Sequence, residues 1–359
     1  MRNSSVSLRD VAQAAGVSLG TASRALNNKA NVLPETRALV LKAATNLGYR
    51  MQFRVPTVGV SKLNTICALI KRDPSERAKL DPFYYAVLCG IENECERLGI
   101  NLMYASLRVD EYSQAVSWSS ALENDDVDGL LIVGAVFNDP SMIARIPRQL
   151  PMVVVDAVAN TLECDMVNTN NARGGYDAVS YLIKRGHTRI GLIGSTTTEP
   201  EHPGITARRQ GYLTALADHG IHETYIQDSQ LHADNAYAAT QQLLDRCPSV
   251  TAIFACNDDI AQFVIKAAQD RGLTVPDDVS VIGFDDTDVA SKTQPPLTTM
   301  HVDKELMGAL AVRQLYERAA DTDRLPITMM MGTKLIERAS VSTYVGERQL
   351  KRASLAGSR

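Results

Sequence analysis

Residues 8–27 read LRDVAQAAGVSLGTASRALN, and this stretch predicts two short helices joined by a tight turn. Gly16 adopts left-handed backbone angles easily, which favours the end of the first helix there. Ser7 and Ser18 stand where their hydroxyls would cap the first and second helices. The apolar residues of the first helix recur at the i, i+3, i+4 and i+7 positions of one face: Leu8, Val11, Ala12 and Ala15.

A third helix is predicted from Pro34, whose fixed φ suits a first helical position, to about Gly48. A tight turn between two helices, followed by a third bracing helix, is the helix-turn-helix arrangement. The alternative, a generic small helical bundle, requires neither so tight a turn nor so polar a second helix. The outer side of that second helix carries Gly20, Thr21, Ser23, Arg24 and Asn27.

Charge is distributed unevenly along the chain. Residues 1–54 carry eight basic and two acidic side chains, a net charge of +6, while the whole chain has a net charge of −4. The remaining 305 residues therefore carry −10. A basic head on an acidic body suits a protein that binds a polyanion through one end, although a charge of this size can also be an ordinary solvated surface.

The run at 8–27, continued by Thr36-Arg37, Ala43-Ala44 and Leu47-Gly48-Tyr49, resembles the lactose/galactose repressor (LacI/GalR) family. The resemblance implies that the second helix enters the major groove of DNA, with Leu19, Gly20 and Arg24 at the positions that read bases. An arginine can bind guanine O6 and N7, and a leucine can contact a thymine methyl group. Gly20 has no side chain with which to read a base.

Other polar residues of this head are assigned to the DNA backbone, where contacts orient the protein without specifying sequence. A phosphate contact is also the alternative role for Arg24. The residues assigned to phosphate contact are Ser7, Ser18, Thr21, Ser23 and Asn27.

The connector at residues 50–63 departs from the family pattern. The resemblance implies a short helix there that places a leucine pair in the minor groove. Here Pro56 stands where the interior of that helix is expected, and Val58 stands at the leucine position. Proline removes a backbone donor and disfavours helix for the residue before it. Whether Val58 or Phe53 fills the minor-groove role therefore stays open.

From Thr65 onward, short apolar runs alternate with helical segments, which predicts parallel sheets of an α/β fold in two lobes. The predicted strands are 66–70, 100–105, 129–134, 151–155, 189–194, 252–256, 279–284 and 297–302. The predicted helices are 84–98, 174–185, 208–219, 235–246, 260–271 and 304–319.

Polar residues follow several of these strands at the ends where open α/β sheets bind ligands. Asp156, Asn257 and Asp285 end three strands, and Arg208 lies at the start of a helix. Carboxylates and amides that converge with one arginine can hold sugar hydroxyls or a polar heterocycle. The alternative role for each is to cap the next helix, and it is the role expected for Asp258, Asp259 and Asp286.

The family resemblance continues through this region, for example in Arg208-x-x-Gly211-Tyr212, Asn257-Asp258 and the run from Val275 to Asp285. It implies a two-lobed core similar to periplasmic sugar-binding proteins, with an effector between the lobes. Leu231 and Val302 replace an aromatic residue and a glutamine that relatives often carry, so the effector's identity stays open. His187 is expected to be structural. The residues to which the effector role carries over are Phe83, Tyr84, Asp156, Asn170, Arg208, Asn257 and Asp285.

The predicted fold is thus an N-terminal all-α helix-turn-helix head and an α/β two-lobed, periplasmic-binding-protein-like core with parallel sheets. The expected domains are 1–49 for the head, 50–63 for the linker, 64–346 for effector binding and dimerisation, and 347–359 for a flexible tail. The first lobe is expected at 64–167 and 301–328, and the second at 168–300 and 329–346.

Several other classes of protein are disfavoured. Nucleotide-binding and hydrolase motifs such as Gly-x-Gly-x-x-Gly and Gly-x-Ser-x-Gly are absent, so neither an enzyme nor a cofactor is expected. The six cysteines show no Cys-x-x-Cys spacing and suit free thiols, and no metal site is expected. The polar N-terminus and the lack of a long apolar run favour a cytoplasmic protein over an exported binding protein or a membrane protein.

The expected function is sequence-specific regulation of transcription, most simply repression, under the control of a small molecule. A sugar or sugar derivative is the first candidate effector and a nucleobase corepressor the second. A homodimer that binds a near-palindromic, double-stranded operator is expected, because two heads related by a two-fold axis read two half-sites. A nucleoid protein that binds DNA without an effector is the remaining alternative.

Overall fold

The structure is a computed structural model in which the chain divides into two compact units, Met1–Val60 and Ser61–Arg359. It describes residues 8–26, 32–46, 63–72, 81–110, 114–116, 127–136, 146, 150–159, 163–198, 201–231 and 233–346. The predicted contact residues Ser7 and Asn27, the connector residues Phe53, Pro56 and Val58, and the predicted tail lie outside these ranges.

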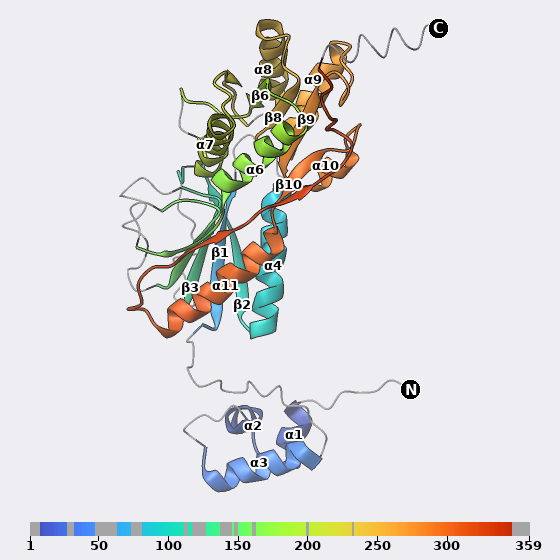
Figure 1. Cartoon of the computed structure of the whole chain (residues 1–359). Helices are drawn as coiled ribbons and strands as arrows, with labels where there is room; N and C mark the ends of the chain where they lie inside the picture. The colour runs from blue at the N-terminus through green and yellow to red at the C-terminus, as the bar shows by residue number, and fades with distance from the viewer. Residues whose placement is uncertain are drawn as a thin grey trace, which may run out of the picture. The chain divides into compact units, whose positions relative to one another are not determined.

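The first unit contains the three predicted helices, α1 (Leu8–Ala14), α2 (Leu19–Leu26) and α3 (Pro34–Asn46) (Figure 1). Gly16 has a φ of +65°, as its place in the turn requires. The amide of Thr21 donates to Ser18 Oγ at 3.1 Å, so the predicted cap of the second helix is confirmed. The three helices share a small core of Val11, Ala12, Ala22, Ala25, Val40, Ala43 and Ala44.

The second unit contains two six-stranded sheets. All strand pairs are parallel except β10 with β12, which confirms the predicted sheet type. The first sheet has the order β11 (Thr328–Met331), β5 (Asp165–Thr169), β4 (Met152–Val155), β3 (Gly129–Val133), β1 (Thr65–Arg72), β2 (Asn101–Arg108). The second has the order β12 (Lys334–Ile336), β10 (Thr298–His301), β9 (Ser280–Asp285), β8 (Ala252–Ala255), β6 (Ile190–Ile193), β7 (Tyr225–Gln227).

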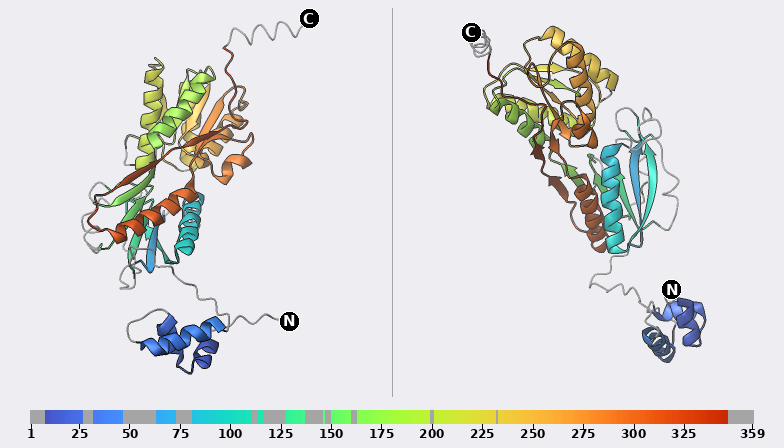
Figure 2. Two further views of the ribbon diagram at one scale, coloured as in Figure 1. Left: turned by 60° about the horizontal axis from the view of Figure 1, so that its bottom comes forward. Right: turned by 90° about the vertical axis from the view of Figure 1, so that its right-hand side faces the viewer.

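Helices cover the sheets because the strand side chains are apolar on both faces. Helices α4 (Pro82–Leu98) and α11 (Lys304–Ala320) lie side by side on one face of the first sheet (Figure 2). Helices α6 (Asn171–Lys184) and α7 (Pro203–Asp218) cover one face of the second sheet. Helices α8 (Ala233–Arg246) and α9 (Asp258–Asp270) cover its other face, and the short α10 (Asp288–Lys292) follows β9.

Strand β8 illustrates this two-sided burial. Phe254 packs with the α6 and α7 side chains, whereas its neighbours Ile253 and Ala255 pack with those of α8 and α9. Alternate residues of a strand point to opposite faces, so a strand between two helical layers must be apolar throughout. Continuous runs of this kind therefore predicted strands correctly in all eight places.

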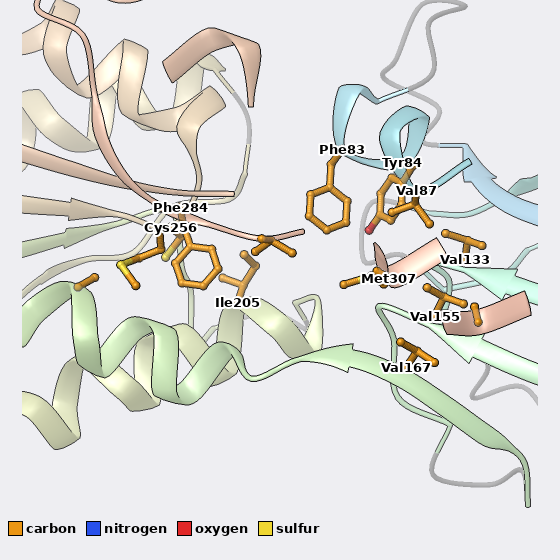
Figure 3. Close-up of a cluster of buried hydrophobic side chains, with 14 of the residues drawn as sticks. Phe83, Tyr84, Val87, Val133, Val155, Val167, Ile205, Cys256, Phe284 and Met307 are labelled. Atoms are coloured by element: carbon orange, nitrogen blue, oxygen red, sulfur yellow. The ribbon is translucent and has the colours of Figure 1, made fainter. Parts of the chain in front are cut away.

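The first sheet with α4 and α11 forms the first lobe, and the second sheet with its helices forms the second. The chain passes between the lobes three times, from β5 to α6, from β10 to α11 and from β11 to β12. These passages are called the crossings below. Phe83 lies between apolar side chains of the two lobes (Figure 3), with Ile205, Cys256 and Phe284 on the second-lobe side and Tyr84 and Val87 on the other.

The cysteines and the lengths of the helices agree with a fold that has neither disulfide bonds nor a membrane span among the described residues. All six cysteines are unpaired, and Cys67, Cys95, Cys164 and Cys256 are buried, in agreement with the prediction. Among the described helices, none is both long enough and apolar enough to cross a membrane.

Asp165, the first residue of β5, ties the segment just before β11 to α11. It is fully buried and accepts from Arg318 Nη2 at 2.6 Å, Gln314 Nε2 at 2.9 Å and the Ile327 amide at 2.7 Å. Burial would raise the pKa of this carboxyl, but the hydrogen bonds from Arg318 and Gln314 leave the pKa below its usual value. The carboxylate thus holds the residue just before β11 against the end of α11.

We predict that Asp165→Ala lowers the free energy of unfolding by about 3–5 kcal/mol, because it leaves Arg318 buried without its counter-ion. Urea unfolding followed by circular dichroism measures the loss. Asp177→Ala is the matched control, since its ion pair with Arg173 is exposed on α6 and should contribute about 0.5 kcal/mol or less. Equal losses for the two variants would contradict the proposed clamp.

Candidate functional site

The carboxyl ends of β8 and β9 meet the start of α7 around a buried ion pair. Arg208 Nη2 donates to Asp285 Oδ1 at 2.8 Å, and both residues are almost fully buried. Arg208 also donates to the Cys256 carbonyl at 2.6 Å and to Asn171 Oδ1 at 2.8 Å. Its guanidinium carbon lies 3.8 Å from the centre of the Phe284 ring. A buried guanidinium needs this many partners, because each unsatisfied donor would cost free energy.

Asp285 is held in a backbone conformation that residues other than glycine rarely adopt. Its φ is +97°, and that of the next residue, Asp286, is +52°. Lys304, at the start of α11, donates from Nζ to the carbonyls of Asp285, Asp286 and Val302. Such strain persists only where the surroundings enforce it, and it gathers at functional sites. The first-lobe helix α11 thus holds the end of a second-lobe strand.

On the side that faces this ion pair, the first lobe contributes Asp156 and Tyr84. Tyr84 donates from its hydroxyl to Asp156 Oδ2 at 3.0 Å, and Lys71 Nζ lies 4.9 Å from the centre of the tyrosine ring. Gly134, with a φ of +73°, leaves room for that ring, since a Cβ there would lie 2.6 Å from it. Any larger residue at position 134 would therefore collide with the ring of Tyr84.

Burial shapes the electrostatics of the facing carboxyl groups. Burial raises the pKa of Asp285 in spite of Arg208 and Lys304, and it raises the pKa of Asp156 in spite of Arg208 and Lys71. The pKa of Asp259 rises to about 6, first through burial and then through the charges of Asp81 and Asp285. Burial thus disfavours the charged form of each of these three carboxyl groups.

The structure separates the predicted site residues into two kinds. Phe83, Tyr84, Asp156, Arg208 and Asp285 lie close together where the two lobes meet. Asn170 and Asn257 cap helices, since their side chains accept from the amides of Arg173 at 3.2 Å and Ile260 at 2.8 Å, and Asn170 also lines the cavity described below.

The expectation that Asp258, Asp259 and Asp286 cap helices is wrong. Asn257 caps α9 and Thr287 stands at the cap position of α10. Asp258 accepts from Thr299 Oγ1 and from the Thr287 amide, and Asp286 pairs with Arg338 and His301. His187 is structural as expected, because its ring bonds Thr251 and the Ser342 carbonyl.

A cavity of about 130 Å³ lies beside Asp156, on the side of the crossings. It is lined by Asp156–Val158, Asn168–Ala172, His202–Gly204, Ala207 and Met330. The lining thus combines the end of β4, the first crossing, the start of α7 and strand β11. Sequence reasoning did not identify His202 or Thr169, and the only signal was Pro203, which marks a helix start.

In the head, Ser18 and Gly20 are exposed and Thr21 is half-buried at the start of α2. The hydroxyls of Ser18 and Thr21 lie 2.8 Å apart. The side chains of Leu19, Ser23 and Arg24 lie outside the described part of the chain, although their backbone belongs to α2. The backbone thus presents the start of the second helix in the way that the helix-turn-helix arrangement requires.

Comparisons with known proteins agree with both units. Residues 7–52 match the description "Bacterial regulatory proteins, lacI family", and residues 179–341 match "Periplasmic binding protein-like domain". The HTH-type transcriptional regulator DegA of Bacillus subtilis is 34% identical over 308 residues, which cover 84% of this chain and 87% of that protein. The chain belongs to the lacI family.

Two further relatives of this lacI-family regulator cover nearly its whole length. The HTH-type transcriptional repressor PurR of Pasteurella multocida is 29% identical over 340 residues, which are 94% of this chain and 98% of that protein. The solved structure of the transcriptional regulator CelR in complex with cellobiose superposes with a TM-score of 0.67 at 28% identity. It covers 93% of this chain and 99% of CelR. The lacI-family chain is a DNA-binding transcriptional regulator with an effector-binding core.

We predict that Asp258 makes the stability of this regulator pH-dependent. Burial and the charge of Asp285 raise its pKa to about 7, above the usual value of 3.8. The folded state therefore binds a proton that the unfolded state releases between about pH 4 and pH 7, and this stabilisation is lost as the pH rises. Urea unfolding from pH 5 to pH 8 should show a fall that is about 2 kcal/mol smaller in Asp258→Asn, in which the raised pKa of Asp259 still causes a fall of its own. Parallel profiles for the two proteins would contradict the assignment.

Proposed function

We propose that this lacI-family protein is a sequence-specific repressor whose second helix, α2, reads the major groove. In this proposal Arg24 binds a guanine, Leu19 contacts a thymine methyl group, and Gly20 leaves its position unread. Ser7, Ser18, Thr21, Ser23 and Asn27 contact phosphates. The exposed start of α2 supports this role, since the free amides at a helix N-terminus attract phosphate.

We further propose that a small molecule binds between the two lobes and controls the affinity for DNA. The proposal extends to the predicted set of Phe83, Tyr84, Asp156, Asn170, Arg208, Asn257 and Asp285. The observation that carries it is the buried pair of Arg208 and Asp285, held at the ends of strands that face Asp156 and Tyr84. A polar site of this kind is formed before the ligand arrives, so little reorganisation is needed on binding.

A sugar or sugar derivative is the effector that these groups suit best. Carboxylate and amide oxygens accept from sugar hydroxyls, and the carboxyl groups of Asp156, Asp259 and Asp285 disfavour an anionic ligand. The likeness to CelR with cellobiose supports the same class. A nucleobase corepressor is the second candidate, since the rings of Phe83 and Tyr84, which meet edge to face with centres 5.1 Å apart, would stack on a planar heterocycle if the lobes moved apart.

The active form is proposed to be a homodimer that binds a near-palindromic operator. Two heads related by a two-fold axis would bind two half-sites, and a change in the angle between the lobes would alter their separation. The coupling between effector and operator binding would then amount to about 1–3 kcal/mol.

Arg24→Ala should remove discrimination between specific and random DNA. The loss of one base contact of this type corresponds to about 1–3 kcal/mol, or roughly tenfold to hundredfold in relative affinity. Selection of bound fragments from a random library, with wild type and variant in parallel, measures the effect. Enrichment of the same site by both proteins would refute the role of this helix.

Asp285→Asn should bind the selected operator but lose the response to its effector, because the neutral amide cannot replace the carboxylate. Thermal shifts with cellobiose, ribose and adenine identify a ligand, since a compound that binds only the folded state raises Tm. The control is Asp288→Asn, whose side chain is 89% exposed and should respond as wild type does. A fully responsive Asp285→Asn protein would remove this residue from the site.

A further inference from the structure

The second lobe has a pocket of its own, with a volume of about 340 Å³. It lies at the carboxyl ends of β6 and β7, beside the first half of α8 (Figure 1), and is called the second-lobe pocket below. All described residues of its wall belong to the second lobe. Its volume falls in the range of about 300–1,000 Å³ that is usual for small-molecule sites. The wall consists of Thr196, Thr198, Asp228, Ser229, Gln230, Asn235, Ala238, Ala239 and Gln242.

Hydrogen bonds fix the two loops of this pocket to each other. The amide of Gly194, at the end of β6, donates to Ser229 Oγ at 2.8 Å, and the amide of Ser229 donates to the Ser195 carbonyl at 3.1 Å. Glu201 holds the loop that follows β6, because its carboxylate accepts from Ser195 Oγ and from the Thr196 amide, both at 3.0 Å. A wall that is fixed in this way needs little ordering when a ligand binds.

The side-chain amides on α8 are oriented by hydrogen bonds to their neighbours. Gln227 Nε2 donates to Gln242 Oε1 at 3.1 Å, and Asn235 Nδ2 donates to Gln230 Oε1 at 3.2 Å. Three groups of the wall make no further hydrogen bond to the described part of the protein: the amide nitrogen of Gln242, the amide oxygen of Asn235 and the hydroxyl proton of Ser229. The wall therefore offers a ligand two donors and one acceptor.

Charge and shape restrict the class of ligand. Asp228 is the one charged residue among the described residues of the wall, and Arg209 Nη1 donates to its Oδ1 at 3.1 Å. An anion would meet this carboxylate without a cationic residue in the described wall, and a cation would compete with Arg209. The described wall also contains no aromatic ring on which a planar heterocycle could stack. An uncharged compound with several hydroxyl groups suits the wall best, because each hydroxyl both donates and accepts.

We propose that the second-lobe pocket binds an uncharged sugar, with Ser229, Asn235 and Gln242 as the residues that hold its hydroxyl groups. The methyl groups of Ala238 and Ala239 offer an apolar surface to the C–H face of the sugar ring. This site is separate from the proposed effector site, since the two sets of residues have no member in common. Because one lobe forms the described wall, the affinity of the pocket does not depend on the angle between the lobes. A ligand with equal affinity for two states shifts neither, so a sugar bound here leaves the affinity for DNA unchanged.

The first test fills the pocket. Ala238 is exposed on α8, so Ala238→Phe places a ring in the pocket without disturbing the core. Calorimetric titration of the full chain with ribose, galactose and cellobiose should show that at least one sugar binds the wild type, and that Ala238→Phe binds one sugar fewer per chain. Ala217→Phe, at an exposed position of α7, is the matched control and should bind as wild type does. Equal binding by the two phenylalanine variants would overturn the proposal.

The second test removes single hydrogen bonds. Asn235→Ala and Gln242→Ala should each weaken the Kd of the sugar that Ala238→Phe excludes by about tenfold, the value of one hydrogen bond. Both side chains are exposed, so the fold should tolerate their loss. Gln210→Ala, at an exposed position of α7, is the matched control and should keep the wild-type Kd. An unchanged Kd in both pocket variants would remove these residues from the site and overturn the assignment.

The third test separates the pocket from the site between the lobes. Asp285→Asn should keep the sugar binding that Ala238→Phe removes, and that sugar should not change the affinity of Asp285→Asn for the selected DNA fragment. If none of the three sugars binds, or if Asp285→Asn abolishes all sugar binding, the second-lobe pocket is not a sugar site and effector control is left standing. A sugar that binds Asp285→Asn and changes its affinity for DNA would overturn the independence of the pocket from the lobe angle.

Discussion

The buried ion pair between Arg208 and Asp285 is the constraint on which the effector core depends. Through one guanidinium it joins α7 to the first turn of α6, to the end of β8 and to the end of β9. Burial of two charges is costly, and hydrophobic residues of equal volume often give a more stable protein. The presence of a buried ion pair where hydrophobic residues would give a more stable protein therefore indicates a role other than stability. It fixes a polar edge on the second lobe, toward which Asp156 and Tyr84 of the first lobe are directed.

The fold was predictable wherever burial on both faces of a strand forces an unbroken apolar run. The eight predicted runs are all strands, and the head followed from apolar spacing together with Gly16 and Pro34. Strands β5, β7, β11 and β12 were not predicted. Strand β5 begins with Asp165 and contains Asn168, and β11 alternates between exposed and half-buried residues. Such strands form because a neighbouring strand offers backbone partners and because buried partners such as Arg318 neutralise their charges, and neither condition is visible in a local stretch of sequence.

The sequence predicted which types of residue form the candidate site, but it predicted less well which individual residues lie there. Carboxylates after strands pointed to the cleft, and Asp156 and Asp285 lie there. Asn170 and Asn257 occur in the same pattern but cap helices, because a polar residue after a strand also precedes a helix in an α/β fold. His202 and Thr169 were missed, since the lining of a cavity is a property of packing between distant segments. Asp259 was assigned to a helix cap and Asp81 was given no role, because they belong to different lobes and their approach is not visible in a local stretch of sequence.

In the proposed control of DNA binding by an effector, the three crossings are the segments that a change of lobe angle would bend. Each lobe has its own sheet, so a change of angle between the lobes leaves both sheets intact and bends only the crossings. Asp165 holds the approach to the third crossing against α11, and Lys304 at the second holds the strained end of β9. The strained residue Asp285 is thereby bonded to both lobes, by Arg208 through its side chain and by Lys304 through its carbonyl. In the proposed function, a ligand that contacts this edge would act at the segments that join the lobes, where small differences in contact between two lobe angles suffice for a coupling of about 1–3 kcal/mol.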